Sequence, residues 1–235
     1  MDIGFALNYQ FIVEVNVTPG ADKKTWAWVG PGINNIGKDN SETTSEDAYF
    51  NNGGNTKTDV TGVSKKYSIE GHRRYGDLFQ DYVASIEDGV GAMRETEYRI
   101  TDPTGRCIEA PCTIMDIAAE GPNGAANEKT AFKCALARSG SSMVVADGTG
   151  KSLPESVTVS APVSVLVNKS AAVKPTVLPT DASNRCVYAI EDDTVATVTA
   201  DGTVTGIKAG ATRLAVKCAS KPSVSAIVEV NVTAS

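Results

Sequence analysis

The chain has a single histidine, His72, which limits the acid–base chemistry available to its side chains. A nucleophilic triad needs a base that is held close to a nucleophile and oriented by a carboxylate, and no Ser-His-Asp spacing surrounds His72. Glycoside hydrolysis needs paired carboxylates in a cleft, and metal-dependent hydrolysis needs a ligand cluster. The sequence has neither pattern, so we expect no catalytic residue, no cofactor and no metal site.

Two short motifs look like ligand sites but lack required residues. Residues 147–152, DGTGKS, match the end of a phosphate-binding loop, yet Val145 stands where the first glycine is needed and Pro154 follows where a helix should propagate. The acidic triplet at residues 191–193 lacks the spaced oxygen ligands of a calcium loop. We interpret the first as loop and the second as solvated turn charges.

The five cysteines contain no C-x-x-C pair, which argues against a zinc site. Cys186 and Cys218 fall on expected strands and could approach one another. The interpretation that the composition favours is small buried thiols in a reducing cytoplasm. The full set is Cys107, Cys112, Cys134, Cys186 and Cys218.

Charge and hydrophobicity describe a soluble globular chain whose acidity lies at one end. The hydrophobic content is 41% and the charged content 21%. The whole formal charge of −6 belongs to residues 1–153, and the remainder is neutral. This balance argues against a sequence-blind nucleic-acid clamp, which needs Lys and Arg to neutralise phosphates. Without a signal peptide or a long apolar run, we expect cytoplasmic synthesis and no membrane contact.

The first 153 residues have the pattern of a mainly β domain with one helix. Alternation over residues 8–18 predicts a half-buried strand, and further strands are expected near Trp26, at 94–100, 106–115 and 130–138. A helix is expected over about 77–88, because Asp77 can cap it with Gln80 three residues later. Gly89 and Gly91 should end it.

Two segments of this part are expected to lack regular structure. Residues 34–66 are poor in apolar side chains and rich in Gly, Asn, Ser, Thr and Asp, which predicts a long polar loop. Residues 139–156 are rich in Gly and Ser and are predicted to be a linker between domains.

The C-terminal part has closely spaced strand and turn signals over residues 192–216. Asp201-Gly202 predicts a two-residue type I′ hairpin turn. The pattern V-A-T-V, turn, G-x-V-T-G resembles the bacterial immunoglobulin-like domain of the BIG2 type, and Val173, Pro175 and Pro179 fit upstream. Tyr188 stands where that family usually has Trp. The resemblance implies an immunoglobulin-like β-sandwich over residues 157–235.

The N-terminal part resembles the tail tube proteins, also called major tail proteins, of long-tailed bacteriophages. The residues that carry this resemblance are an early W-x-x-V-G-x-G-I segment from Trp26 to Ile33 and the block G-H-R-R-Y-G-D-x-x-Q-D-Y-V at residues 71–83. An R-x-T strand and a P-x-G hairpin follow them. The resemblance implies a β-sandwich or barrel of tail-tube type, with one flanking helix, over residues 1–153.

The same resemblance implies a structural virion protein and not an enzyme. Copies would form hexameric rings, stacked into a hollow tube through which DNA passes without specific binding. The protein would be made in the host cytoplasm and reside in the virion tail. Implied partners are the tape measure, tail terminator and distal tail proteins. The immunoglobulin-like domain would decorate the exterior, where weak contact with host-surface carbohydrate is a family-level expectation.

Two sets of residues are candidates for assembly contacts. In tail tube proteins a long loop reaches the next ring, and here it corresponds to Asp39, Asn40, Ser41, Glu42, Thr43, Thr44, Ser45, Glu46 and Asp47. A second candidate is an intersubunit cluster of His72, Arg73, Arg74 and Asp77, whose charges could pair with a neighbouring subunit. The alternatives are a surface loop without a partner and a solvated strand end with weak surface pairs.

Three other functions fit parts of the sequence. A bacterial surface adhesin would use an immunoglobulin-like module, but a secretion signal and tandem copies are expected there. A cell-wall-degrading enzyme would need paired carboxylates in a cleft or a cluster of metal ligands, and the sequence has neither pattern. A tube protein of a contractile tail or secretion apparatus would share the fold, and residues alone do not separate it from the first hypothesis.

Overall fold

The computed structural model describes residues 6–145 and 152–234. Residues 147–151 of the phosphate-loop-like motif, and the centre of the predicted linker, lie outside the described residues. The chain divides into two compact units, each built from separate parts of the sequence. Unit 1 comprises Met1–Pro31, Tyr98–Glu109 and Ser142–Ser235, and unit 2 comprises Gly32–Glu97 and Ala110–Ser141. The predicted domain division near residue 153 stays a prediction.

The N-terminal strands form an eight-stranded sheet, which agrees with the predicted mainly β fold. Its order is β2-β1-β5-β6-β7-β4-β3, and β8 pairs with β6. The strands are β1 (Ile12–Asn16), β2 (Trp26–Trp28), β3 (Ile33–Ala48), β4 (Thr56–His72), β5 (Glu95–Thr101), β6 (Cys107–Ala118), β7 (Ala131–Arg138) and β8 (Met143–Val145). Short 3-10 turns lie at Asn8–Gln10, Phe50–Asn52 and Gly91–Arg94.

The first strand is shorter and more buried than its alternation predicted. Strand β1 begins at Ile12, after a 3-10 turn, and all five of its residues are buried. Glu14 is therefore a buried carboxylate. It lies opposite Arg99 of β5, whose Nε is 2.7 Å from Glu14 Oε2, and Arg185 of the same unit donates to Oε1. The prediction of a strand with only one buried face was wrong, because the polar Glu14 and Asn16 are buried as well as the apolar residues.

The predicted helix is present as α1 (Leu78–Ser85), the only α-helix among the described residues. Its N-cap is Asp77, whose Oδ1 accepts a hydrogen bond of 2.9 Å from the Gln80 N–H. The helix ends before the predicted residue 88, because the chain turns after Ser85 and the Gly89 N–H bonds to Ile86 O. The Arg94 Nε donates to Gly89 O at 2.6 Å and fixes this turn.

The expected linker is partly strand. Residues of β8 pair with Cys107–Glu109 of β6, from Cys107↔Val145 to Glu109↔Met143. Its C-terminal end forms β9 (Ser156–Thr158), which pairs with β12 (Thr176–Leu178). Strand pairing at both ends corrects the prediction of an unstructured segment over 139–156.

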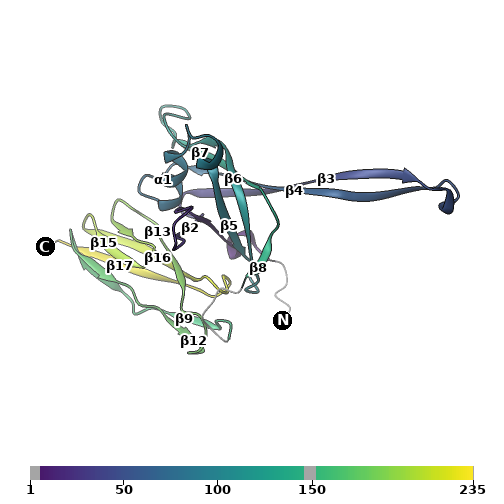
Figure 1. Ribbon diagram of the computed structural model, residues 1–235. Coiled ribbons are helices and arrows are strands. Elements are labelled where there is room, and N and C mark those ends of the chain that lie inside the picture. The colour runs from purple at the N-terminus through teal and green to yellow at the C-terminus, as the bar shows by residue number, and fades with distance from the viewer. Residues whose placement is uncertain (1–5, 146–151, 235) are drawn as a thin grey trace. The chain divides into compact units, whose positions relative to one another are not determined.

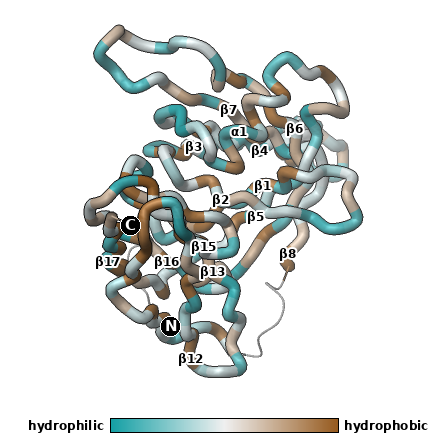
Figure 2. Tube along the Cα trace, turned by 90° about the vertical axis from the view of Figure 1, so that its left-hand side faces the viewer, coloured by the Kyte–Doolittle hydropathy of each residue, from teal (hydrophilic) through white to brown (hydrophobic). Residues whose placement is uncertain are grey.

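The C-terminal segment consists of three small sheets around an apolar core. Their orders are β10-β17-β16-β13, β11-β15-β14 and β12-β9. Fifteen buried residues, most of them valines, form the core, and hydrophobic residues recur along β16 and β17 in Figure 2. The remaining strands are β10 (Val163–Leu166), β11 (Ser170–Ala172), β13 (Cys186–Ile190), β14 (Ala196–Val198), β15 (Thr203–Gly206), β16 (Gly210–Cys218) and β17 (Ser225–Thr233).

The turn between β14 and β15 is not the predicted two-residue type I′ turn. It is a loop over residues 199–202 in which only Gly202 has a positive φ, of 85°. The Gly202 N–H bonds to Thr199 O, and the Thr199 N–H bonds to Thr203 O, both at 3.0 Å. The Asp201 carboxylate accepts from Thr199 and Thr203, so its side chain stabilises a right-handed turn conformation.

Gly202 also lies under the ring of Tyr188. A Cβ at this position would lie 2.7 Å from Tyr188 Cζ. We expect Gly202→Ala to lower the unfolding free energy by about 2–4 kcal/mol, through the positive φ and the overlap with the ring. The matched control is Gly121→Ala, since Gly121 has a φ of 79° with open space around it. Urea denaturation should give about 1–2 kcal/mol for the control, and equal losses would contradict the role of the ring.

Candidate functional site

The segment predicted as a long polar loop is a β-hairpin, which corrects that prediction. Strands β3 and β4 pair antiparallel from Ile33↔Gly71 to Ala48↔Thr56. Only Lys66–His72 of β4 also pairs with β7. Beyond these residues the two strands run on as a paired ribbon, as Figure 1 shows. We call residues 40–65 the arm.

The arm lacks a hydrophobic face. Apart from the half-buried Ser45, Gly62 and Lys65, every residue of the arm is exposed. Both of its strands have an outer edge with no partner strand among the described residues. A two-stranded ribbon on its own is marginally stable in water, and unpaired strand edges are templates for pairing. The arm is thus a surface that another chain could cover.

The tip of the arm is compact and aromatic. The 3-10 turn Phe50–Asn52 is followed by Gly53 and Gly54, both with positive φ. The Asn55 Nδ2 donates to Asn52 O at 2.9 Å, and the Asn52 Nδ2 donates back to Asn55 O at 3.3 Å. This turn holds the Phe50 side chain fully exposed, with Tyr49 half exposed beside it.

Charges are distributed unequally over the two strands of the arm. On β3 the arm carries only acidic groups, Glu42, Glu46 and Asp47. On β4 it carries Lys57 and Lys65 together with Asp59. Within the arm Lys57 and Asp59 form an ion pair at 3.0 Å, and both side chains are at least half exposed. The β3 edge is therefore acidic, whereas the β4 edge has an excess of positive charge.

The nine loop residues predicted to stack rings all lie on β3. Asp39 lies opposite Lys66 near the base, and Asp47 lies opposite Lys57 near the tip. The full set is Asp39, Asn40, Ser41, Glu42, Thr43, Thr44, Ser45, Glu46 and Asp47, and all but Ser45 are exposed. They form one continuous strand edge and not a flexible excursion.

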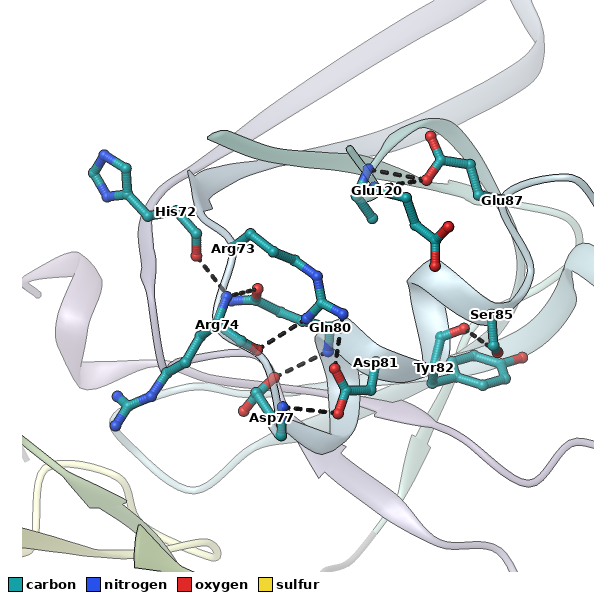
Figure 3. A network of polar contacts seen from close by, with 12 residues as sticks. His72, Arg73, Arg74, Asp77, Gln80, Asp81, Tyr82, Ser85, Glu87 and Glu120 are labelled. Carbon is teal, nitrogen blue, oxygen red and sulfur yellow. Dashed lines mark hydrogen bonds and ion pairs between the residues drawn. The ribbon is translucent and has the colours of Figure 1, made fainter. Parts of the chain in front are cut away.

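The base of the arm is fastened to α1 through Gln80, whose side chain is fully buried. Its Oε1 accepts from the Arg74 N–H at 2.7 Å, and its Nε2 donates to His72 O at 3.2 Å (Figure 3). The helix itself packs on the sheet through Phe79, whose ring lies edge-on to Phe132 with centroids 5.9 Å apart. Gln80 thereby fixes the orientation of the end of β4 relative to α1.

Two glycines allow β3 and β4 to approach closely at this base. The His72 N–H donates to Gly32 O at 2.8 Å. A Cβ at Gly71 would lie 2.2 Å from that same oxygen. These roles of Gly32, Gly71 and Gln80 were not predicted from the sequence. A glycine inside a strand pattern, which often marks close backbone approach, was the available signal for Gly71.

Two members of the predicted intersubunit cluster, Arg73 and Asp77, make polar contacts within the chain. The Arg73 Nη2 lies 2.8 Å from Asp81 Oδ1, its side chain is 4% exposed, and its guanidinium stacks 4.4 Å from the Tyr75 ring centroid. Asp77 caps α1, and burial raises its pKa to about 6 against the lowering effect of the Gln80 N–H. The Arg73 charge is buried and paired within unit 2, and an intersubunit role for Arg73 stays a prediction.

The other two members of that cluster have different surroundings. The His72 side chain is exposed, and in Figure 3 its imidazole points away from the network. The Arg74 guanidinium also points away from Gln80 in that view, while its charge lowers the pKa of Asp77. An intersubunit role for His72 and Arg74 stays a prediction.

Within residues 6–145 and 152–234, no group of three or more His, Cys, Asp or Glu side chains could hold a metal ion. In that part of the chain no helix has the length and apolarity needed to span a bilayer. The arm, with its exposed side chains and strand edges that are unpaired among the described residues, is the feature of unit 2 that another chain could bind.

Comparison with known proteins gives a family for the C-terminal segment. Residues 155–228 match the family model described as bacterial Ig-like domain (group 2), which confirms the predicted immunoglobulin-like domain. A search of curated proteins finds no match.

Among solved structures, a chain from the tail of an empty gene transfer agent particle, refined with C6 symmetry, aligns with a TM-score of 0.45 and 16% identity. A chain from the virion of a native gene transfer agent particle aligns with the same values. Each alignment covers 60% of this chain and 100% of the other.

Proposed function

We propose that this protein is a non-enzymatic structural subunit of a virion tail, which assembles with copies of itself into the tail tube. The observation that carries the proposal is the arm, a paired ribbon without a buried face or a partner strand. The resemblance of residues 71–83 to tail tube proteins supports it, because that block builds the base from which the arm extends.

The charges of the arm favour a second copy of the chain as its partner. The acidic β3 edge of one copy complements the more basic β4 edge of the next. Such a contact joins two different surfaces and is heterologous, so repeating it generates a closed ring or an open helical filament. We propose closure into hexameric rings that stack into a tube, in which arms also reach the adjacent ring.

The acidity of the chain suits a conduit for DNA. A formal charge of −6 repels phosphates, so a duplex inside the tube would stay mobile and would not be bound specifically. We propose that the neutral immunoglobulin-like domain decorates the tube exterior. The tape measure, tail terminator and distal tail proteins are the proposed partners at the tube ends.

The match of residues 155–228 favours a second candidate function, a binding protein of the bacterial surface. In that case the purified chain would adhere to bacterial cells or cell-surface carbohydrate as a monomer. The same preparation tests both functions, because a tube subunit should polymerise without any added ligand.

The decisive experiment is negative-stain electron microscopy of the full chain over a concentration series. We expect hollow tubes with a regular axial repeat at high protein concentration, and slow assembly in analytical ultracentrifugation. Assembly should weaken as salt is raised, because the proposed contact pairs exposed charges. Featureless monomers at every concentration and ionic strength would contradict the proposal.

A further inference from the structure

Two buried thiols face one another across neighbouring strands of the C-terminal segment. Cys186 is the first residue of β13 and Cys218 the last residue of β16, and the register places them directly opposite. Both are free cysteines, 8% and 0% exposed. Nothing in the proposed function uses this pair, and the inference below does not depend on that function.

The hydrogen-bond pattern shows which kind of cross-strand pair they form. The Ala219 N–H donates to Arg185 O, and the Glu191 N–H donates to Arg213 O, both at 2.9 Å, so these positions are hydrogen-bonded pairs. Cys186↔Cys218 falls between them in the alternation, and the Cys218 N–H donates to Val224 O instead. Non-hydrogen-bonded pairs bring Cα atoms to about 4.5 Å and side chains closest.

That spacing lies within the range of a disulfide, for which Cα atoms are about 4.4–6.8 Å apart. No other cysteine of the described strands faces a cysteine. Cys107 lies opposite Val145, Cys112 opposite Arg138 and Cys134 opposite Ile69.

We propose that Cys186 and Cys218 are a latent disulfide site, which closes by thiol–disulfide exchange when the chain meets a small oxidised disulfide such as oxidised glutathione. The Cys218 thiolate attacks one glutathione sulfur, which forms a mixed disulfide and releases one glutathione thiolate. The Cys186 thiolate then attacks the Cys218 sulfur and releases the second. The protein loses two protons and two electrons, and oxidised glutathione gains them and becomes two glutathione thiols.

The position of the pair in the sheet gives the reagent access. Strand β13 is at the edge of its sheet, and the cysteines lie at the end of the β13–β16 ladder. Ladder ends open locally without unfolding the sheet. The neighbouring Cys186 thiol lowers the pKa of Cys218, which favours Cys218 as the attacking thiolate.

Once formed, the bond would link the start of β13 to the end of β16. The closed loop contains β14 and β15, so the disulfide would restrict the unfolded chain. We expect the melting temperature of the C-terminal segment to rise by about 5 °C or more.

The test uses the full chain treated with oxidised glutathione under native conditions. We expect two of the five thiols to disappear, with a mass lower by two hydrogen atoms and one cross-linked peptide pair containing Cys186 and Cys218. Cys134→Ala, which removes another buried thiol, should oxidise as the unaltered chain does. Cys186→Ala and Cys218→Ala should not close a bond.

Peptide mapping of the unaltered chain keeps the proposal testable even where a variant fails to fold. A stable glutathione adduct without ring closure, a disulfide between two chains, or retention of all five thiols after prolonged treatment would each overturn it. Loss of tube assembly in any of these samples would bear on the proposed function and not on this site.

Discussion

Removing residues 42–63 and joining Ser41 to Ser64 through an Asn-Gly turn is expected to abolish self-assembly while leaving a folded monomer. The two serines lie opposite one another, so the shortened strands can close in the native register. The deletion also removes the irregularity between Thr43 and Thr44. Because the removed part contributes no buried side chain, the unfolding free energy should change by less than about 1 kcal/mol.

The measurement pairs thermal unfolding with electron microscopy of concentrated protein. We expect a nearly unchanged melting temperature and a complete absence of tubes. Normal polymerisation of the shortened chain would exclude the arm as the assembly contact. An unfolded product would instead be seen at once by circular dichroism.

A charge-reversal pair tests whether opposite strand edges meet. Glu42→Lys, Glu46→Lys and Asp47→Lys together make β3 basic, and Lys57→Glu with Lys65→Glu makes β4 acidic. Each variant alone should fail to assemble, because like charges facing each other cost several kcal/mol. An equimolar mixture should recover tubes, since every contact then joins opposite charges. Failure of the mixture would contradict the head-to-tail contact.

The arm also shows where sequence patterns stop being informative. Strand prediction relies on apolar residues alternating with polar ones, and β3 has no buried residue to create that alternation. The composition of residues 34–66 therefore resembled a loop. The remaining signals were weak, namely threonines with strand propensity and Gly53-Gly54 at the turn.

Elements with a buried face were predictable, and their limits were not. The Asp77 cap of α1 followed from local chemistry and is present. The pairing of Arg73 with Asp81, in the first turn of α1, was not predicted, because it depends on how the end of β4 meets the helix. The prediction of a type I′ turn at Asp201-Gly202 was wrong because the Asp201 carboxylate stabilises a different loop.

The immunoglobulin-like domain was predictable over nearly its whole length. Its valines alternate along β10 and β17, and buried residues alternate with more exposed ones along β16, so the pattern specifies both the strands and the buried face. The cross-strand position of Cys186 and Cys218 needed the register, which the sequence does not provide.

Replacing Glu14 by Ala is expected to lower the unfolding free energy by about 3–5 kcal/mol, because it leaves a nearly buried guanidinium unpaired. The Glu14 and Arg99 side chains are 1% and 11% exposed. The Arg99 guanidinium also stacks 4.4 Å from the Trp26 ring centroid. Both tryptophans of the chain lie in β2, next to β1, so urea denaturation followed by tryptophan fluorescence reports on this sheet.

The pair Lys24–Glu109 of the same unit, whose side chains are 40% and 17% exposed, is the matched control. Its atoms are 2.8 Å apart, but Lys24 is 40% exposed, so Glu109→Gln should cost less than about 1 kcal/mol. Changing Glu14 and Arg99 together to Leu should recover part of the loss, because the nearly buried Arg99 guanidinium is then removed too, while Arg185, the other partner of Glu14, is 32% exposed and remains hydrated. If Glu14→Ala costs no more than Glu109→Gln, the carboxylate is not the buried anchor of β1, and apolar packing of Ile12 and Val15 holds the strand.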